Sequence, residues 1–201
     1  MQTFATTAPI TANLDIPAGL VQFIAADRAD TAVEVRPSDA SKSRDVKAAE
    51  QITVEFADGV LRINGAKGTK ILGSSGSVEI TVQLPAGSRV EAKAACAEFR
   101  GVGRLGDIAF EAAQSDIKID EAAQVRLTTQ AGDVHVGSLT GSAEISTQKG
   151  DIALGVAAGL SASLDAGTSY GRIHNSLKNN GTPDLTIRAT TSYGDITARS
   201  L

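Results

Sequence analysis

Gly132-Asp133-Val134 is the motif that decides the fold, because it returns further along the chain as Gly150-Asp151-Ile152, Gly171-Arg172-Ile173 and Gly194-Asp195-Ile196. Each copy follows a strand end that is rich in Thr and Ser. Self-similarity at a nearly constant period is the sequence sign of a repeat architecture. We therefore expect this part of the chain to be a stack of short β-strand units.

Two less regular copies extend the repeat toward the N-terminus, at Ala97-Glu98-Phe99 and Ser115-Asp116-Ile117. The middle residues of the six copies are 18, 17, 18, 21 and 23 positions apart. Gly106-Asp107-Ile108 is out of phase, and we assign it to a different corner of the same coil. The spacing predicts an all-β fold: a single-stranded β-helix or solenoid-like stack of roughly 18-residue coils over residues 95–201.

The buried face of each coil can be read from the sequence, because side chains alternate between the two faces of a strand. Matching apolar or Thr residues are expected to point inward in three successive coils: Ile117, Ile119, Ala122, Val125, Leu127 and Thr129; Val134, Val136, Leu139, Ala143, Ile145 and Thr147; and Ile152, Leu154, Leu160, Ala162 and Leu164. The residues between them in the first two coils are largely polar. This pattern is typical of strands with one buried face.

Residues 1–94 carry further strand signals without a regular period, and we expect them to form an irregular β-rich part that caps the stack. Seven strands are expected here: Ile10–Ile16, Leu20–Ala26, Thr31–Arg36, Gln51–Phe56, Val60–Asn64, Ser77–Leu84 and Arg89–Ala94. Asp58-Gly59 predicts a hairpin turn. A polar stretch predicts one short helix over residues 44–50 with Ser43 as its N-cap, and Gly65 to Gly76 is interpreted as a loop.

Composition and charge argue against several classes of protein. The net charge of −4 is spread along the 201 residues, so we expect no nucleic-acid binding. Met1 to Leu14 lacks the basic and apolar regions of a signal peptide, and no apolar run has the length of a membrane span. We expect a cytoplasmic protein without membrane insertion. The single cysteine, Cys96, lies in a run of alanines and is expected to be a small buried hydrophobe.

These pieces together resemble a known bacterial family. The resemblance depends on Ile16-Pro17-Ala18-Gly19, Val33-Glu34-Val35-Arg36-Pro37, Ala48-Ala49-Glu50 and the serial Gly-Asp-Val/Ile units that end in Ser192-Tyr193-Gly194-Asp195-Ile196. The chain is similar, over nearly its whole length, to β-strand-repeat proteins of unknown function that are described as putative adhesins. The resemblance implies a β-helix-like fold and a bacterial, actinobacterial source, and it transfers no catalytic residue.

Two sets of residues are candidates for a structural or functional role at the corners. Asp116, Asp133, Asp151 and Asp195 are expected to line one edge of the stack. They either cap the corners by hydrogen bonding to backbone amides or bind a divalent cation weakly. Tyr170 and Tyr193 occupy matching corners and are expected to stack on each other. His135 and His174 are expected on the outer surface, too far apart to share a metal.

No catalytic cluster, nucleophile motif or metal-binding motif is found in the sequence, so we expect a protein that is not an enzyme and needs no metal or cofactor. The function that the sequence favours is a structural or protein-interaction module, with an unknown protein partner or with self-association. One alternative is a self-assembling cytoplasmic scaffold similar to bactofilin polymers, because the chain stops after Gly194-Asp195-Ile196 and leaves the final coil open. The other is a carbohydrate-binding or carbohydrate-active protein.

Overall fold

The computed structural model describes residues 1–65 and 76–201. Most of the loop predicted between Gly65 and Gly76 therefore lies outside the described residues. The described residues form these elements: β1 (Gln2–Ala5), β2 (Thr11–Ala26), β3 (Asp30–Pro37), α1 (Ser43–Glu50), β4 (Thr53–Ala57), β5 (Val60–Asn64), β6 (Val78–Pro85), β7 (Arg89–Leu105), β8 (Ile108–Ala122), β9 (Val125–Thr128), β10 (Val134–Leu139), β11 (Ala143–Ser146), β12 (Ile152–Val156), β13 (Ala162–Tyr170), β14 (Ile173–Ser176), β15 (Leu185–Tyr193) and β16 (Ile196–Ser200). No helix among them is long and apolar enough to cross a membrane, and the cytoplasmic location stays a prediction.

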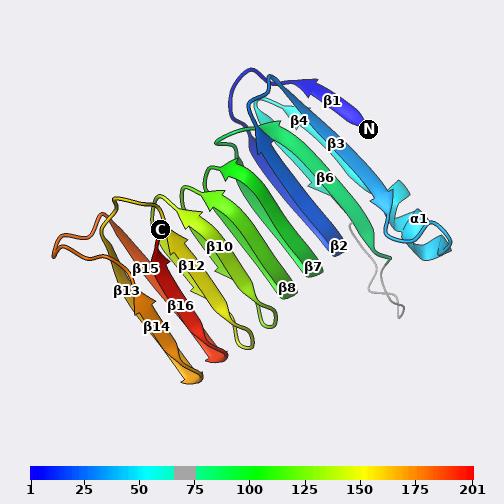
Figure 1. Cartoon of the computed structure of the whole chain (residues 1–201). Coiled ribbons are helices and arrows are strands. Elements are labelled where there is room, and N and C mark those ends of the chain that lie inside the picture. The colour runs from blue at the N-terminus through cyan, green and yellow to red at the C-terminus, as the bar shows by residue number, and fades with distance from the viewer. Residues whose placement is uncertain (66–75) are drawn as a thin grey trace.

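The strands belong to one mostly parallel sheet that folds back on itself into two layers (Figure 1). In layer A the order is β1-β3-β6-β2-β7-β8-β10-β12-β16-β14. In layer B the order is β4-β5-β2-β7-β8-β9-β11-β15-β13. The long strands β2, β7 and β8 bend at a corner and serve both layers. We call a stretch of chain that runs once along layer B and once along layer A a rung.

Successive rungs stack through parallel pairing at the spacing of the sequence motif. Val134 pairs with Ile117 on one side and with Ile152 on the other, so these rungs are 17 and 18 residues apart. Because matching residues meet across each pair, equal side chains form columns along the stack. The repeat and its phase are thus those that the sequence predicts for residues 115–156.

The stacking order departs from the chain order at the C-terminal end. Ile152 pairs with Ile196, and Ile196 pairs in turn with Ile173, so the rung of residues 185–200 lies between those of 143–156 and 162–176. A single-stranded β-helix with regular 18-residue coils is therefore not confirmed. The two longest motif spacings, 21 and 23 residues, belong to the rungs that exchange places. Skipping one rung adds about 5 Å of path, which two extra residues can span.

One apolar core fills the space between the layers, from Ile10 to Ala198. All twelve inward residues predicted for the first two coils are buried. Three phenylalanines continue the core toward the N-terminal end, with ring centroids 5.7 Å apart for Phe23 and Phe99 and 4.8 Å apart for Phe99 and Phe110. Leu160 and Leu164 are only partly buried, because they belong to the last rung in space.

Antiparallel strands and a helix lie at the N-terminal end. β3 runs antiparallel to β6, β1 runs antiparallel to β3, and β4 runs antiparallel to β5, while α1 packs against β3. Asp58 and Gly59, with φ of 51° and 74°, form the predicted hairpin turn. β7 runs without a break across residue 94, where the division between two parts stays a prediction.

Several local predictions for this half need correction. The strands predicted at 10–16 and 20–26 are one strand, β2, and β1 was not predicted. The N-cap of α1 is Lys42, which makes no side-chain capping bond, and Ser43 is already helical. Cys96 is exposed, because Ala95 and Cys96 lie side by side at the corner of β7, where the inward-outward alternation breaks.

Candidate functional site

The four predicted aspartates form a hydrogen-bonded ladder at one corner of the stack. In each rung the Asp Oδ1 atom accepts a hydrogen bond from the backbone N–H of the matching residue in the next rung. The bonds run from Asp133 N to Asp116, 3.0 Å; Asp151 N to Asp133, 2.8 Å; Asp195 N to Asp151, 2.7 Å; and Arg172 N to Asp195, 2.8 Å. The aspartates therefore cap the amides of the neighbouring rung rather than those of their own turn.

Arg172 ends this ladder. It lies in the last rung in space, so its amide is capped by Asp195 and no further rung presents an amide for it to cap. Along the sequence Arg172 stands between two aspartates of the repeat, whereas in the structure it is the terminal member. An arginine in place of the repeated aspartate thus marks the end of the stack.

Every ladder residue except Asp116, which follows Ser115, is preceded by a glycine that a close backbone approach requires. A Cβ atom on Gly150 would lie 2.0 Å from the carbonyl oxygen of Gly132, and one on Gly194 would lie 2.0 Å from that of Gly150. Both glycines also have positive φ, 147° and 150°. Residues that carry a side chain rarely adopt this backbone conformation. The Gly-Asp pair is therefore one structural unit of the corner.

The ladder offers little to a metal ion. One oxygen of each carboxylate already accepts an amide, and the described residues contain no group of three or more His, Cys, Asp or Glu that is able to hold a metal. His135 and His174 share an outer column but are separated by Ala153 and Thr197. They are therefore three rung spacings apart, about 14 Å. The cation-binding hypothesis gains no support from this geometry.

Tyr170 and Tyr193 lie at neighbouring positions on the last two rungs in space and stack face to face. Their ring centroids are 4.9 Å apart and the planes differ by 5°. Lys149 and Ala131 occupy the same column in the preceding rungs. The side of the Tyr170 ring that faces away from Tyr193 points beyond the end of the stack, and 67% of this residue is exposed.

The rung of residues 162–176, which we call the terminal rung, presents an open end. Among the strands of the described residues, β13 pairs with β15 alone and β14 pairs with β16 alone (Figure 1). The first amide of β13, Ala162 N, donates to the carbonyl oxygen of Lys178, 2.9 Å away in the segment that follows β14. Ile173 is 45% exposed, although the matching residues Ile117, Val134, Ile152 and Ile196 are at most 2% exposed. Of the described residues, the exposed large hydrophobic ones are Met1, Tyr170, Ile173, Tyr193 and Leu201. All but Met1 belong to the terminal rung or its neighbour.

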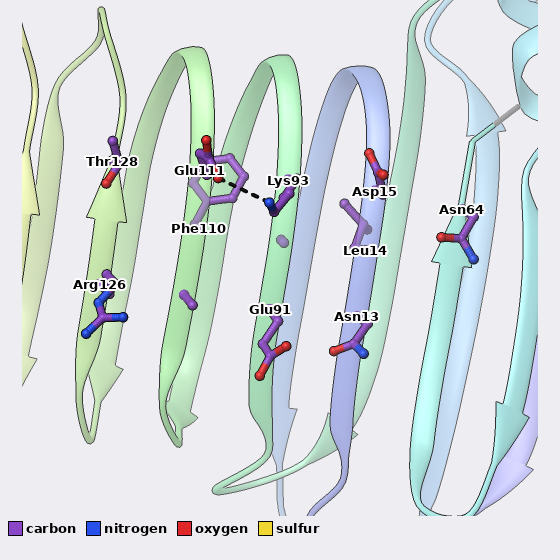
Figure 2. Close-up of a pocket in the computed structure, with 12 residues that line it drawn as sticks. Asn13, Leu14, Asp15, Asn64, Glu91, Lys93, Phe110, Glu111, Arg126 and Thr128 are labelled. Atoms are coloured by element: carbon purple, nitrogen blue, oxygen red, sulfur yellow. Dashed lines mark ion pairs between the residues drawn. The ribbon is translucent and has the colours of Figure 1, made fainter. Parts of the chain in front are cut away.

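Layer B also carries a groove with a volume of about 350 Å³ (Figure 2). The small side chain of Ala109 leaves space for the groove, because this residue stands between Glu91 and Arg126 in the outward column. Lys93 Nζ and Glu111 Oε2 form an exposed ion pair across two strands, 3.3 Å apart. The lining charges are mixed and solvated, which is typical of an ordinary sheet surface.

The groove gives no aromatic surface on which a sugar could stack. Its aromatic residue, Phe110, is 3% exposed and packs against Phe99 in the core. Carbohydrate sites are expected to combine such a platform with clustered carboxylates. The carbohydrate alternative therefore gains no support from the groove.

Fold and site together define a class: a repeat protein of parallel strands whose corner carboxylates are used to hold the rungs together. Within this class, the chain belongs to the Toastrack DUF4097 family, whose model matches residues 45–200. Among curated proteins, none matches this chain.

Solved structures of similar architecture come from several bacteria. A putative cell adhesion protein from Clostridium sporogenes is 11% identical, with a TM-score of 0.49, over 100% of this chain and 98% of that one. A putative adhesin from Bacteroides fragilis is 14% identical, with a TM-score of 0.40, over 98% and 96% of the two chains. A putative lipid binding protein from Parabacteroides distasonis is 10% identical, with a TM-score of 0.37, over 98% and 95%. At these values the likeness assigns no function to this chain.

Proposed function

We propose that this Toastrack protein is a non-enzymatic interaction module that binds a protein partner through its terminal rung. The observation that carries the proposal is the coincidence of two features on one rung. Among the described residues, β14, and β13 beyond its first residue, each leave one edge without a partner strand, and Tyr170 and Ile173 expose apolar surface beside these edges.

An open strand edge is a binding site of known chemistry. Its free N–H and C=O groups pair with an added strand, and side-chain pockets beside it add specificity. Soluble proteins commonly protect such edges with lysine or proline, and neither residue occurs in β13 or β14. Tyrosine is also enriched at the centre of protein interfaces. These features support a protein partner over a small molecule.

The other surfaces support the non-enzymatic part of the proposal. The ladder carboxylates hold backbone amides, and the groove in layer B offers mixed exposed charges around one ion pair. A general acid or base needs a group that is free to exchange a proton with a substrate, in a position that excludes water. Neither the ladder carboxylates nor the Lys93–Glu111 pair combines these properties.

A photo-crosslinking amino acid placed at position 170 or 173 of the full chain tests the proposal in living cells. We expect a covalent adduct with a protein at both positions. The matched control is position 135, which is exposed on layer A in the middle of the stack, and we expect no adduct there. Absence of any adduct at 170 and 173, under conditions that crosslink a known complex, would contradict the proposal.

A further inference from the structure

We infer that the partner of the terminal rung is a second copy of this chain, and that two copies join end to end about a two-fold axis. The new contact is an antiparallel pairing of the open edges of β13 and β14. This inference rests on the proposed function, because it names the partner of the same surface.

The terminal rung offers two strand edges at once. β13 forms the end of layer B and β14 the end of layer A, with Ile173 and the partly buried Leu164 between them. A partner that covers the whole end must supply two strand edges with the same separation and an apolar strip between them. A second terminal rung has this shape by construction, as in any contact that a two-fold axis generates.

The aspartate ladder favours an antiparallel partner strand over a parallel one. Within the stack, the backbone amide of each added parallel rung donates a hydrogen bond to an aspartate of the rung before it, as Arg172 N donates to Asp195 Oδ1. A further parallel rung would meet Arg172, which has no acceptor for its amide. A two-fold axis reverses the chain direction across the contact instead. The pairing is antiparallel whether β14 meets its own copy or β13, because the chain runs in opposite directions along the two layers.

The charges at the open end of the stack are balanced. Residues 162–184 carry two acidic side chains, Asp165 and Asp184, and two basic ones, Arg172 and Lys178, while the whole chain has a net charge of −4. Two copies of this balanced end meet without the repulsion that two aspartate ladders would create.

The difference between the two ends of the stack limits the assembly to two copies. At the opposite end of the stack the last strands are β1 and β4, which are antiparallel and only four and five residues long, and α1 packs against β3. Among the described residues, neither of these two short edges matches β13, which has nine residues. A closed pair results, rather than the filament of a bactofilin-like scaffold.

Sedimentation velocity of the full chain, over about 1–100 µM, tests the inference, because this range covers micromolar dissociation constants. We expect the mass to rise to twice the 20.6 kDa of one chain and to stop there. Ile173→Lys and Tyr170→Lys should each weaken the dimer at least about tenfold. Lysine already occupies the Tyr170 column at Lys149, so the second variant is compatible with the fold. His135→Lys, in layer A in the middle of the stack, should leave the dimer unchanged.

Three results would overturn the inference: a monomer at every concentration, growth beyond two copies, or a dimer that neither terminal-rung variant weakens while both keep the parent melting temperature. The crosslinking experiment separates the two proposals. An adduct from position 170 with a different protein leaves the proposed function standing and removes the second copy as the partner. No adduct at all removes both.

Discussion

A single added methyl group at the corner glycine should be enough to break the stack. Gly150→Ala places a Cβ atom 2.0 Å from the carbonyl oxygen of Gly132 and strains a φ of 147°. We expect it to lower the free energy of unfolding by at least about 3 kcal/mol, measured by urea denaturation. Gly167→Ala is the control, because nothing lies within 4 Å of its new Cβ and the cost should stay under about 0.5 kcal/mol. Equal effects would contradict the role of the close approach.

Two members of the ladder column should respond differently to the same substitution. Asp133→Ala removes the acceptor of Asp151 N and should cost about 0.5–1.5 kcal/mol. Arg172→Ala removes a side chain that caps no amide, so its cost should be close to zero. Denaturation of both variants measures the difference. A larger loss for Arg172→Ala would contradict the direction of the ladder.

At the scale of the element, one column of strand residues contains its own control. Val134 in β10 is 1% exposed and Ile173 in β14 is 45% exposed, at matching positions. Val134→Asp buries an unpaired charge and should cost more than about 4 kcal/mol. Ile173→Asp leaves its charge near water and should cost under about 1 kcal/mol in the monomer. Thermal melts at low protein concentration distinguish the two, and similar losses would contradict the stacking order.

The turn before α1 predicts a pH dependence. Hydrogen bonds from Ser41, with a smaller contribution from Lys42, lower the pKa of the Asp39 carboxyl from 3.8 to about 2. Because the pKa is lowered by folding, the stabilisation is complete above about pH 5 and is lost as the pH falls toward 2. An NMR titration should place the Asp39 midpoint near 2 and show it rising in Ser41→Ala. A midpoint that Ser41→Ala does not move would contradict this assignment of the cause.

The sequence predicts best the elements that repeat. The alternation of apolar and polar residues was sufficient to identify the inward faces of β8 to β11, since each such side chain meets its own kind in the next rung. β1 could not be found in this way, because its four residues carry no such pattern and are held by pairing with β3. Ile173 and Ile196 look alike locally, and only long-range strand pairing decides which of them is covered. Arg172 was the available signal, and its meaning follows only from the structure.

For the whole molecule, the two ends of the stack differ in kind. Short antiparallel strands make up the N-terminal end, with α1 packed against β3, whereas the other end exposes an internal segment, the terminal rung. The C-terminal strand β16 is held between β12 and β14. An open end that is tied to the chain on both sides is already ordered for a partner, which lowers the entropic cost of association.

Hydrogen–deuterium exchange of the full chain at low and high protein concentration tests this account most directly. We predict slow exchange over residues 196–200 at both concentrations, despite their place beside the chain terminus, because β16 is paired on both sides. Residues 173–176 should exchange fast at low concentration and become protected at high concentration, as the second copy pairs with β14. Fast exchange over 196–200 together with concentration-independent protection over 173–176 would contradict both the stacking order and the terminal rung as the binding end.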